Sequence, residues 1–267
     1  MTIRCAKAGK RIAALGILAA CTMCQQKEVA PAPSADFAFR GTPGEVLTLA
    51  TSDTCTAASV ATPAQTVSWD LGNGTQASTP KVVLSYPVAG TYTVRLTATN
   101  QAGETRTALK TVRVLNRVLK RIVINRVYWA LAPGSIPNFN ATWPTTMTAD
   151  VHALIQEWTV GATFPSGGLV PSAPVLFRSA SLPAVSYDTR TPLTINVPAG
   201  FVFDKQKFQD RKYILSLLAT NAEGTYCLFS NLFSGSGATI TKENLARNEF
   251  SVTTSLISSM TFECEYE

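Results

Sequence analysis

The segment "TYTVRLTAT", residues 91–99, alternates apolar and polar side chains at every position. A period of two describes a strand with one face buried and the other in water, as in an antiparallel sheet. Similar short segments, broken by Gly, Pro and Asn, recur along the chain, and no helical apolar stripe is sustained beyond residue 24. The sequence therefore predicts an all-β fold.

Length and composition set the scale of this fold. The 267 residues have room for one large domain or two of ordinary size. Hydrophobic residues make up 46% of the chain and charged residues 15%, which is typical of a packed protein and not of a disordered one.

The net charge of +6 is concentrated near the start of the chain. Four of the 23 basic residues lie in the first 20 positions, which contain no acidic residue, and the remaining 19 stand against 17 acidic residues. The rest of the chain is therefore nearly neutral, and we expect no nucleic-acid partner.

The first 20 residues have the form of a secretory leader. Four basic residues precede the apolar run "IAALGILAA", which is too short to span a bilayer as a lasting helix. The run ends in Leu18-Ala19-Ala20-Cys21, which resembles the lipobox of bacterial lipoproteins. In that family the cysteine receives a diacylglycerol and becomes the N-terminus after cleavage. The resemblance implies a signal peptide over residues 1–20 and a lipid anchor at Cys21, which acyl chains would make stable.

Cys24 follows Cys21 at a C-x-x-C spacing, which also occurs in redox and metal sites. Such a site needs a second ligand pair or a folded helix N-terminus. The chain has no other C-x-x-C and a single histidine, His152, so we favour the lipoprotein interpretation. Residues 21–34 then form a polar, Pro/Ala-rich tether. We expect the protein in the bacterial cell envelope, on the periplasmic or surface side of the outer membrane.

Residues 35–116 are predicted to form the first folded domain. Its ordered motifs are Trp69-Asp70-Leu71-Gly72-Asn73-Gly74, Ser78, Pro80, Tyr86, Gly90-Thr91-Tyr92-Thr93-Val94, Leu96, Thr99-Asn100 and Gly103. This series resembles the polycystic kidney disease (PKD) repeat, which implies an immunoglobulin-like β-sandwich that acts as a spacer or a contact module. Asp70 could be assigned to a calcium or catalytic site, but we expect Trp69 to fill the core and Asp70 to cap a turn.

Residues 117–267 are predicted to form a second, larger antiparallel β-sandwich. Turn signals separate its strand candidates, and a short helix is predicted at residues 241–247. The basic residues at its start are interpreted as solvated strand ends and a charged inter-domain seam, the alternative being a basic contact patch: Arg117, Lys120, Arg121 and Arg126. The strand candidates are residues 148–158, 175–179, 192–197, 212–220, 225–230, 249–255 and 260–267.

Five segments of this second half form a recognisable series: "IVINRVYW", "ADVHALIQEW", "PLTINVP", "KYILSLLATNAEG" and "MTFECEYE". Together they resemble the C-two-type calcium- and lipid-binding sandwich of Bacteroidota lipoproteins. Calcium-binding members carry clustered aspartates, which supply hard oxygen ligands. The matching loops here offer Asp150, Asn221 and Glu223, which are too few carboxylates, so we expect no metal and no cofactor.

Cys227 and Cys264 are each predicted to lie on the inward face of a strand, judged from Phe229, Phe262 and Tyr266. A disulfide between them is permitted outside the cytoplasm and would stabilise the fold by roughly 3–4 kcal/mol. The alternative is two separate buried thiols, which behave as small hydrophobic groups.

The segment "YWALAPGSIPNFNATWP" is the candidate ligand-facing loop. Aromatic rings could stack on sugars and asparagines could pair with hydroxyl groups; alternatively, the aromatics pack into a satellite core. The residues proposed for ligand contact are Tyr128, Trp129, Asn138, Asn140 and Trp143.

Catalytic signatures are missing from the sequence. His152 is the single histidine, and no H-E-x-x-H, G-x-S-x-G, Walker or G-x-G-x-x-G motif occurs. We therefore assign no catalytic residue and expect a non-catalytic glycan- or protein-binding or scaffold module anchored to the membrane. The alternatives are an envelope hydrolase with its site in the second domain and a spacer without ligand.

Overall fold

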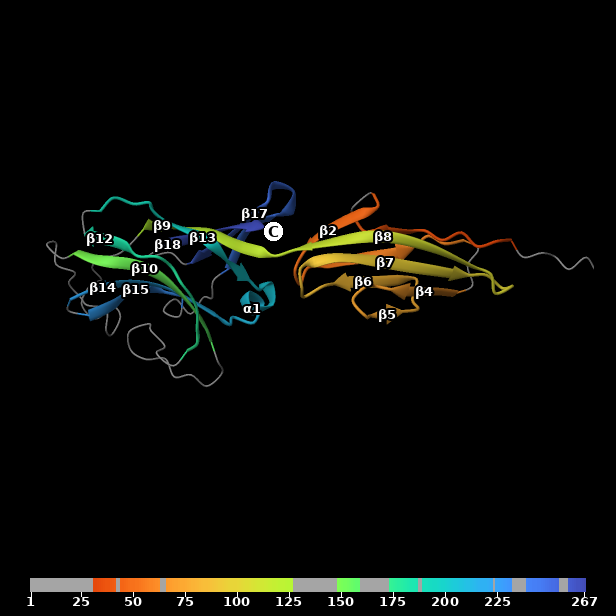
Figure 1. Ribbon diagram of the computed structural model, residues 1–267, viewed down its shortest axis with the longest axis horizontal. Coiled ribbons are helices and arrows are strands. Elements are labelled where there is room, and N and C mark those ends of the chain that lie inside the picture. Colours follow the sequence, from red (N-terminus) through yellow and green to blue (C-terminus); the bar gives the residue numbers. More distant parts are fainter. Residues whose placement is uncertain are drawn as a thin grey trace, which may run out of the picture.

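The computed structural model describes residues 31–41, 44–62, 66–126, 148–158, 173–186, 189–222, 224–231, 239–254 and 259–267. Within them the chain is built from β-strands, in two sandwiches that lie end to end (Figure 1). The predicted all-β fold, with an immunoglobulin-like sandwich followed by a larger antiparallel one, is confirmed.

The first sandwich packs a three-stranded sheet, in the order β1-β3-β6, on a five-stranded sheet, in the order β2-β8-β7-β4-β5. Neighbouring strands pair antiparallel except β2 and β8, which pair parallel. The strands are β1 (Phe37–Phe39), β2 (Val46–Ala50), β3 (Thr54–Ser59), β4 (Thr66–Asp70), β5 (Gln76–Ala77), β6 (Lys81–Ser85), β7 (Gly90–Thr99) and β8 (Thr105–Leu115).

The core of this sandwich follows from the alternation along its strands. In β7, Val94, Leu96 and Ala98 are fully buried, and the residues between them face outward. Trp69 lies at the centre, 1% exposed, with its ring edge-to-face against Phe37. Burying side chains of this size contributes about 1.5–3 kcal/mol each, so this core is the main source of stability in the first sandwich.

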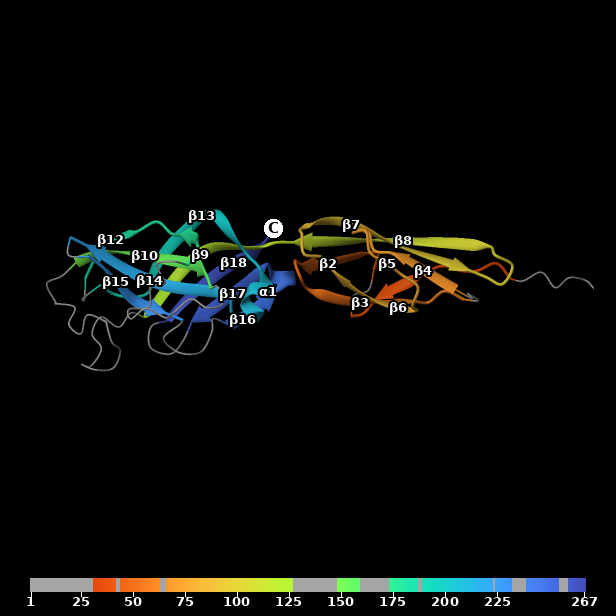
Figure 2. The same ribbon diagram turned by 90° about the horizontal axis from the view of Figure 1, so that it is seen from below.

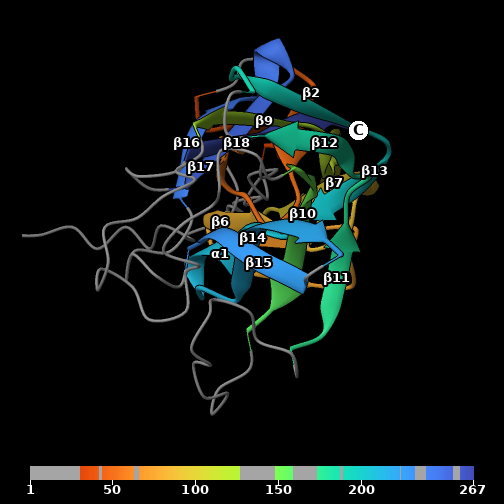
Figure 3. The ribbon, with the colours of Figure 1, turned by 90° about the vertical axis from the view of Figure 1, so that its left-hand side faces the viewer.

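The second sandwich consists of two five-stranded sheets, which Figure 3 shows one above the other. One has the order β11-β10-β14-β15, with β12 also paired to β10, and the other has the order β13-β9-β18-β17-β16. The strands are β9 (Arg117–Arg126), β10 (Thr148–Glu157), β11 (Val175–Arg178), β12 (Leu182–Ser186), β13 (Leu193–Phe203), β14 (Tyr213–Asn221), β15 (Gly224–Ser230), β16 (Thr239–Asn244), β17 (Glu249–Thr254) and β18 (Ser259–Tyr266).

The helix predicted at residues 241–247 is wrong. Residues up to Asn244 belong to β16, which pairs with β17, and only η1 (Leu245–Arg247) is a 3-10 turn. The cross-strand hydrogen bonds to β17 outweigh the helical propensity of "KENLAR". The five-residue α1 (Lys205–Gln209) lies elsewhere and is capped by the Asp204 carboxylate, which accepts from the amide of Gln206. Among the described residues, no helix combines the length and apolarity needed to cross a membrane.

The two sandwiches share one connection, in which Asn116 alone separates β8 from β9 (Figures 1 and 2). The end of the chain lies beside this connection: the amide of Asn116 donates to the carbonyl of Glu267, 2.6 Å away, and the amide of Glu267 donates back over 3.1 Å. Ala50, from β2 of the first sandwich, is buried in the core of the second. The connection is therefore held by backbone hydrogen bonds and by the packing of Ala50 into the core of the second sandwich.

Candidate functional site

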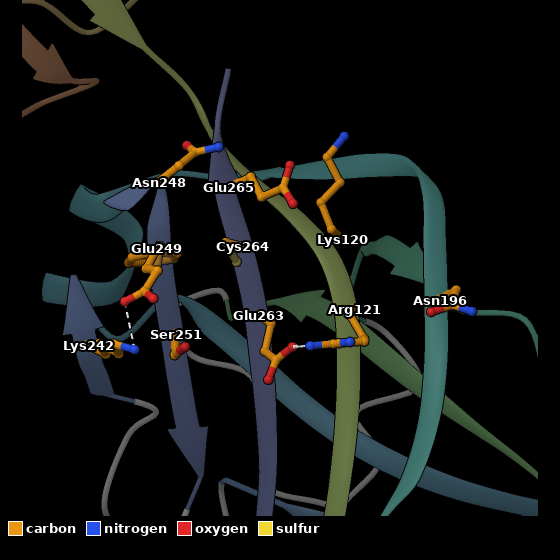
Figure 4. Close-up of a pocket in the computed structure, with 11 residues that line it drawn as sticks. Lys120, Arg121, Asn196, Lys242, Asn248, Glu249, Ser251, Glu263, Cys264 and Glu265 are labelled. Atoms are coloured by element: carbon orange, nitrogen blue, oxygen red, sulfur yellow. Dashed lines mark hydrogen bonds and ion pairs between the residues drawn. The ribbon is translucent and has the colours of Figure 1, made fainter. Parts of the chain in front are cut away.

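The outer face of the β13-β9-β18-β17-β16 sheet carries a cavity of about 470 Å³, here called the polar groove (Figure 4). Cross-strand register places one polar residue of each strand in a line across the sheet, because each faces the next directly. Four strand spacings make this line about 19 Å long. From β13 to β16 the line is Asn196, Arg121, Glu263, Ser251 and Lys242; Lys120, Glu265, Asn248 and Glu249 lie along one side of it.

Ion pairs hold the long side chains of the polar groove. The Arg121 guanidinium donates to the Glu263 carboxylate, and the Lys242 ammonium lies 2.6 Å from Glu249. The hydrogen bond from Lys242 holds the pKa of Glu249 below its ordinary value. Lys120 lies 2.6 Å from Glu267 at the edge of the groove. Pairs as exposed as these add little to stability, so their main effect is to orient donors and acceptors.

Local backbone features place the residues at one end of the groove. Asn248 ends the 3-10 turn in the left-handed conformation, with φ 52°, which an asparagine tolerates. Its side-chain oxygen accepts from the amide of Tyr266, 2.5 Å away, and so ties the start of β17 to β18. Phe250 and Cys264 lie beneath the groove in the core, so it has a packed floor.

The polar groove offers both hydrogen-bond donors and hydrogen-bond acceptors. Its side chains are carboxylates, ammonium and guanidinium groups, amides and one hydroxyl. His152 lies on β10, in the opposite sheet. Within the described residues, no three His, Cys, Asp or Glu side chains are grouped to hold a metal ion. The arrangement is suited to binding a polar ligand.

A second cluster of charges lies between the sandwiches and is here called the seam cluster: Asp53, Arg117, Lys205, Glu243 and Tyr266. Arg117 is completely buried, and its guanidinium donates to the Thr51 carbonyl (2.6 Å), to Asp53 (2.7 Å) and to Glu243 (2.6 Å). Lys205 reaches the same two carboxylates, at 2.5 and 3.7 Å.

Two aromatic side chains contact the charged groups of the seam cluster: its own member Tyr266 and the neighbouring Phe250. The Tyr266 hydroxyl donates to Glu243 over 2.8 Å, and the Arg117 guanidinium lies 5.6 Å from the centre of the Phe250 ring. Burial, with the neighbouring Glu243 carboxylate, raises the pKa of Tyr266, which therefore remains a donor. Of the basic residues at the start of the second domain, Arg117 thus belongs to a charged inter-domain seam, whereas Lys120 and Arg121 line the polar groove.

Trp69 and Asp70 have structural roles, as expected. The Trp69 indole donates to the carbonyl of Thr79 over 2.8 Å, and the Asp70 carboxylate accepts from the amide of Gly72 over 2.9 Å. Gly72 has φ +78°, and a Cβ there would lie 2.6 Å from the carbonyl oxygen of Thr93. The turn after Asp70 therefore requires glycine and uses the carboxylate as its cap.

His152 is buried and paired. Its Nε2 lies 2.8 Å from the guanidinium of Arg178, which donates to it, and its exposed fraction is 4%. Burial, and then the positive charge of Arg178, lower the pKa of His152 below its ordinary value of 6.5. The imidazole is therefore held neutral, and its Nε2 atom accepts a structural hydrogen bond from Arg178.

In the structure Cys227 and Cys264 are two separate free thiols and are not joined by a disulfide. The prediction that Cys227 faces inward is wrong. A register shift between Leu217 and Leu218 of the partner strand places Phe229 in the main core and Cys227 in a separate cluster on the other side of the sheet. Cys264 does lie in the main core. Burial raises the pKa of Cys227 to about 12, so its thiol is protonated at neutral pH.

Several predicted positions lie outside the described residues. They include the lipidation site Cys21 and the whole candidate ligand loop, that is, Tyr128, Trp129, Asn138, Asn140 and Trp143. Of the sparse calcium-loop candidates, Glu223 also lies outside; Asp150 accepts from the amide of Ala184, and Asn221 accepts from the amide of Gly224.

The polar groove was not predicted as a site. The outward alternation of Glu263 and Glu265 in the last strand was the available signal. Lys242 was assigned to a helix, and nothing in the sequence indicates that Asn196 lies beside Arg121. These residues meet only through the register of five strands.

The first sandwich is similar to known proteins in its sequence. The family model of the PKD domain matches residues 36–113. Among solved structures, the PKD1 domain of Vibrio anguillarum Epp is 32% identical, covering 32% of this chain and 94% of its own, with a TM-score of 0.25. The PKD1 domain of the Vibrio cholerae metalloprotease PrtV is 26% identical, covering 32% and 98%, with a TM-score of 0.25.

A further solved structure is similar over more of the chain but at low identity. It comes from work on the promiscuous specificity of carbohydrate-binding modules of the β-sandwich superfamily. It is 11% identical and covers 89% of this chain and 98% of its own, with a TM-score of 0.27. Among curated proteins, no match to the chain was found.

Proposed function

Since residues 36–113 are a PKD domain, we propose that the chain is a lipid-anchored protein of the bacterial cell envelope with a stalk and a binding head. The PKD domain is the stalk and the second sandwich is a non-catalytic head that contacts a glycan or an envelope protein. Cys21, after the leader, carries the lipid, on the periplasmic or surface side of the outer membrane.

The polar groove is the observation that carries this proposal. It lies on the second sandwich, and the described chain enters at the far end of the first sandwich, where the Pro31 carbonyl accepts from Asn100 (Figure 1). An anchor preceding residue 31 would leave both sandwiches projecting away from the membrane. The seam cluster supports the stalk role, because buried charges with satisfied hydrogen bonds favour one orientation of the two sandwiches.

The anchor is tested by feeding cells a fatty-acid probe and comparing wild type with Cys21→Ala. We expect the label to be lost in Cys21→Ala and kept in the matched control Cys24→Ala. Equal labelling of wild type and Cys21→Ala would contradict the anchor.

The head is tested by incubating the protein, without its lipid, with a panel of polysaccharides and with envelope proteins. Retention of an intact polymer or a saturable complex with one envelope protein supports a binding module. Release of reducing sugar ends would instead support the hydrolase, and silence with the whole panel would support a spacer.

A further inference from the structure

We infer that the polar groove binds an uncharged, multiply hydroxylated polymer, a neutral polysaccharide segment lying across the five strands. The inference rests on the proposed binding function and specifies its ligand. Its first support is size: a cavity of about 470 Å³ falls within the range of about 300–1,000 Å³ that is typical of small-ligand sites. The line of polar residues runs about 19 Å across the sheet, which suits an extended chain of several sugar units.

The charge of the groove argues for a neutral ligand. Three basic side chains (Lys120, Arg121 and Lys242) face three acidic ones (Glu249, Glu263 and Glu265), so the lining carries no net charge. Arg121 and Lys242 already have carboxylate partners. A polyanion would have to displace these carboxylates and lie beside them, and a polycation would displace the two basic groups. A neutral polymer can bind without displacing either partner of an ion pair and without being repelled by the carboxylates or the basic groups.

The groove presents donors and acceptors in fixed positions, as vicinal hydroxyl groups require. A guanidinium has five N–H donors and a carboxylate has about four acceptor sites, so the Arg121–Glu263 pair keeps both kinds free on its outer side. Asn196 adds an amide with donors and acceptors at the next position in the line. Pairs of adjacent donors and acceptors match adjacent hydroxyls, each of which donates and accepts.

Ser251 gives the ligand its closest approach to the sheet. It lies in the line between Glu263 and Lys242, both of which have much longer side chains, as Figure 4 shows. Its short side chain leaves a low point between them. A bulky side chain at this position would fill the groove without entering the core, because position 251 faces outward from β17.

A protein partner fits the groove less well. Protein interfaces are anchored by aromatic and other large apolar side chains in their centres. Of the lining residues, the apolar ones are Phe250 and Cys264, which are 1% and 4% exposed and lie in the floor. The exposed lining is polar throughout the described residues.

Affinity electrophoresis through gels containing dextran, laminarin, mannan or the polyanion alginate tests the inference. We expect at least one neutral polymer to retard the wild type and alginate not to. Ser251→Tyr should weaken this retardation at least tenfold. Thr93→Tyr, on an exposed strand position of the PKD domain, is the matched control and should bind like wild type. Asn196→Ala is a second groove variant that removes an exposed side chain, should Ser251→Tyr lose its native melting temperature.

Two outcomes would overturn the inference: no retardation by any neutral polymer, whether or not alginate retards the protein, or equal retardation of wild type and both groove variants. If Trp143→Ala abolishes binding while Ser251→Tyr keeps it, the aromatic loop is the site instead. The proposed function fails separately, through unchanged fatty-acid labelling of Cys21→Ala or through silence towards the envelope proteins as well. A complex with one envelope protein but no neutral polymer would leave the proposed function standing and remove this inference.

Discussion

The seam cluster and the polar groove use the same types of side chain in opposite environments. At the seam, Arg117 is fully buried and three acceptors surround it within 2.7 Å. In the groove, the side chains of Arg121 and Lys242 are 53% and 56% exposed, and among the described residues each is paired with one carboxylate. Buried charges are costly when a partner is lost, whereas exposed pairs are screened by water and salt. The seam should therefore govern stability, and the groove should be free to exchange partners with a ligand.

The largest expected effect is at Arg117. Arg117→Met removes the positive charge and leaves Asp53 and Glu243 with Lys205 as their remaining cation. We expect the free energy of unfolding, measured by denaturant titration, to fall by about 3–5 kcal/mol. The matched control is Arg113→Met, four residues earlier on the exposed face of β8, with an effect within about 0.5 kcal/mol. Equal effects of the two substitutions would mean that the contrast between seam and surface is wrong.

Tyr266→Phe tests the seam more gently, because it removes one hydroxyl and keeps the ring. The Tyr266 hydroxyl donates to the charged Glu243, so its loss should cost about 1.5–3 kcal/mol. Tyr92→Phe is the control: that hydroxyl donates to the neutral carbonyl of Val88, also over 2.8 Å but in an exposed position. Thermal unfolding of both variants should rank Tyr266→Phe as the more destabilised, and the reverse order would refute the ranking.

The environment of His152 differs from both the seam cluster and the polar groove, because a buried neutral base lies beside the positive charge of Arg178. In the unfolded chain it titrates near its ordinary pKa of 6.5, whereas burial and Arg178 lower the pKa in the folded chain. As the pH falls through 6.5, the unfolded chain takes up a proton that the folded chain does not, so stability falls. We expect the melting temperature of the wild type to drop between pH 7.5 and 5.5, and that of His152→Gln to drop less. Identical pH profiles would show that His152 keeps its ordinary pKa when folded.

The smallest effect is expected in the groove. Arg121→Gln should change the free energy of unfolding by about 0–1 kcal/mol, because its pair with Glu263 is exposed. Raising the salt concentration to about 1 M should remove the remaining difference from wild type, since the Debye length then falls to about 3 Å. The deficit of Arg117→Met should persist at the same salt concentration. A loss at Arg121 comparable to that at Arg117 would erase the distinction between the two regions.

The fold was predictable from the sequence where local pattern and structure agree. The alternation of residues 91–99 gave the buried face of β7, and the motif around Trp69 gave the core and the turn of the first sandwich. In the second sandwich the strand predicted at residues 212–220 agrees within one residue at each end with the observed β14, Tyr213–Asn221. Such features are determined by residues that are close together along the chain, so a local sequence pattern is enough to predict them.

The predictions failed where one strand depends on another. A bulge beside Leu218 reverses the face of Cys227. Pairing with β17 makes residues 241–244 of the expected helix part of β16. The burial of Arg117 depends on Asp53 and Glu243, which are 64 and 126 residues away along the chain. The groove likewise requires the register of five strands. Pairing of this kind is set by tertiary contacts, which a local pattern does not encode.

The hydrogen bonds between Glu267 and Asn116 bear on how the protein can be handled. They place Glu267 at the connection between the two sandwiches, beside the seam cluster (Figure 1). The Glu267 side chain contacts Lys120 at the edge of the polar groove. An affinity tag or fluorescent fusion appended after Glu267 would therefore emerge between the sandwiches and crowd both the seam cluster and the polar groove. A label inserted in the Asn100–Gly103 turn, at the far end of the first sandwich, would leave them undisturbed.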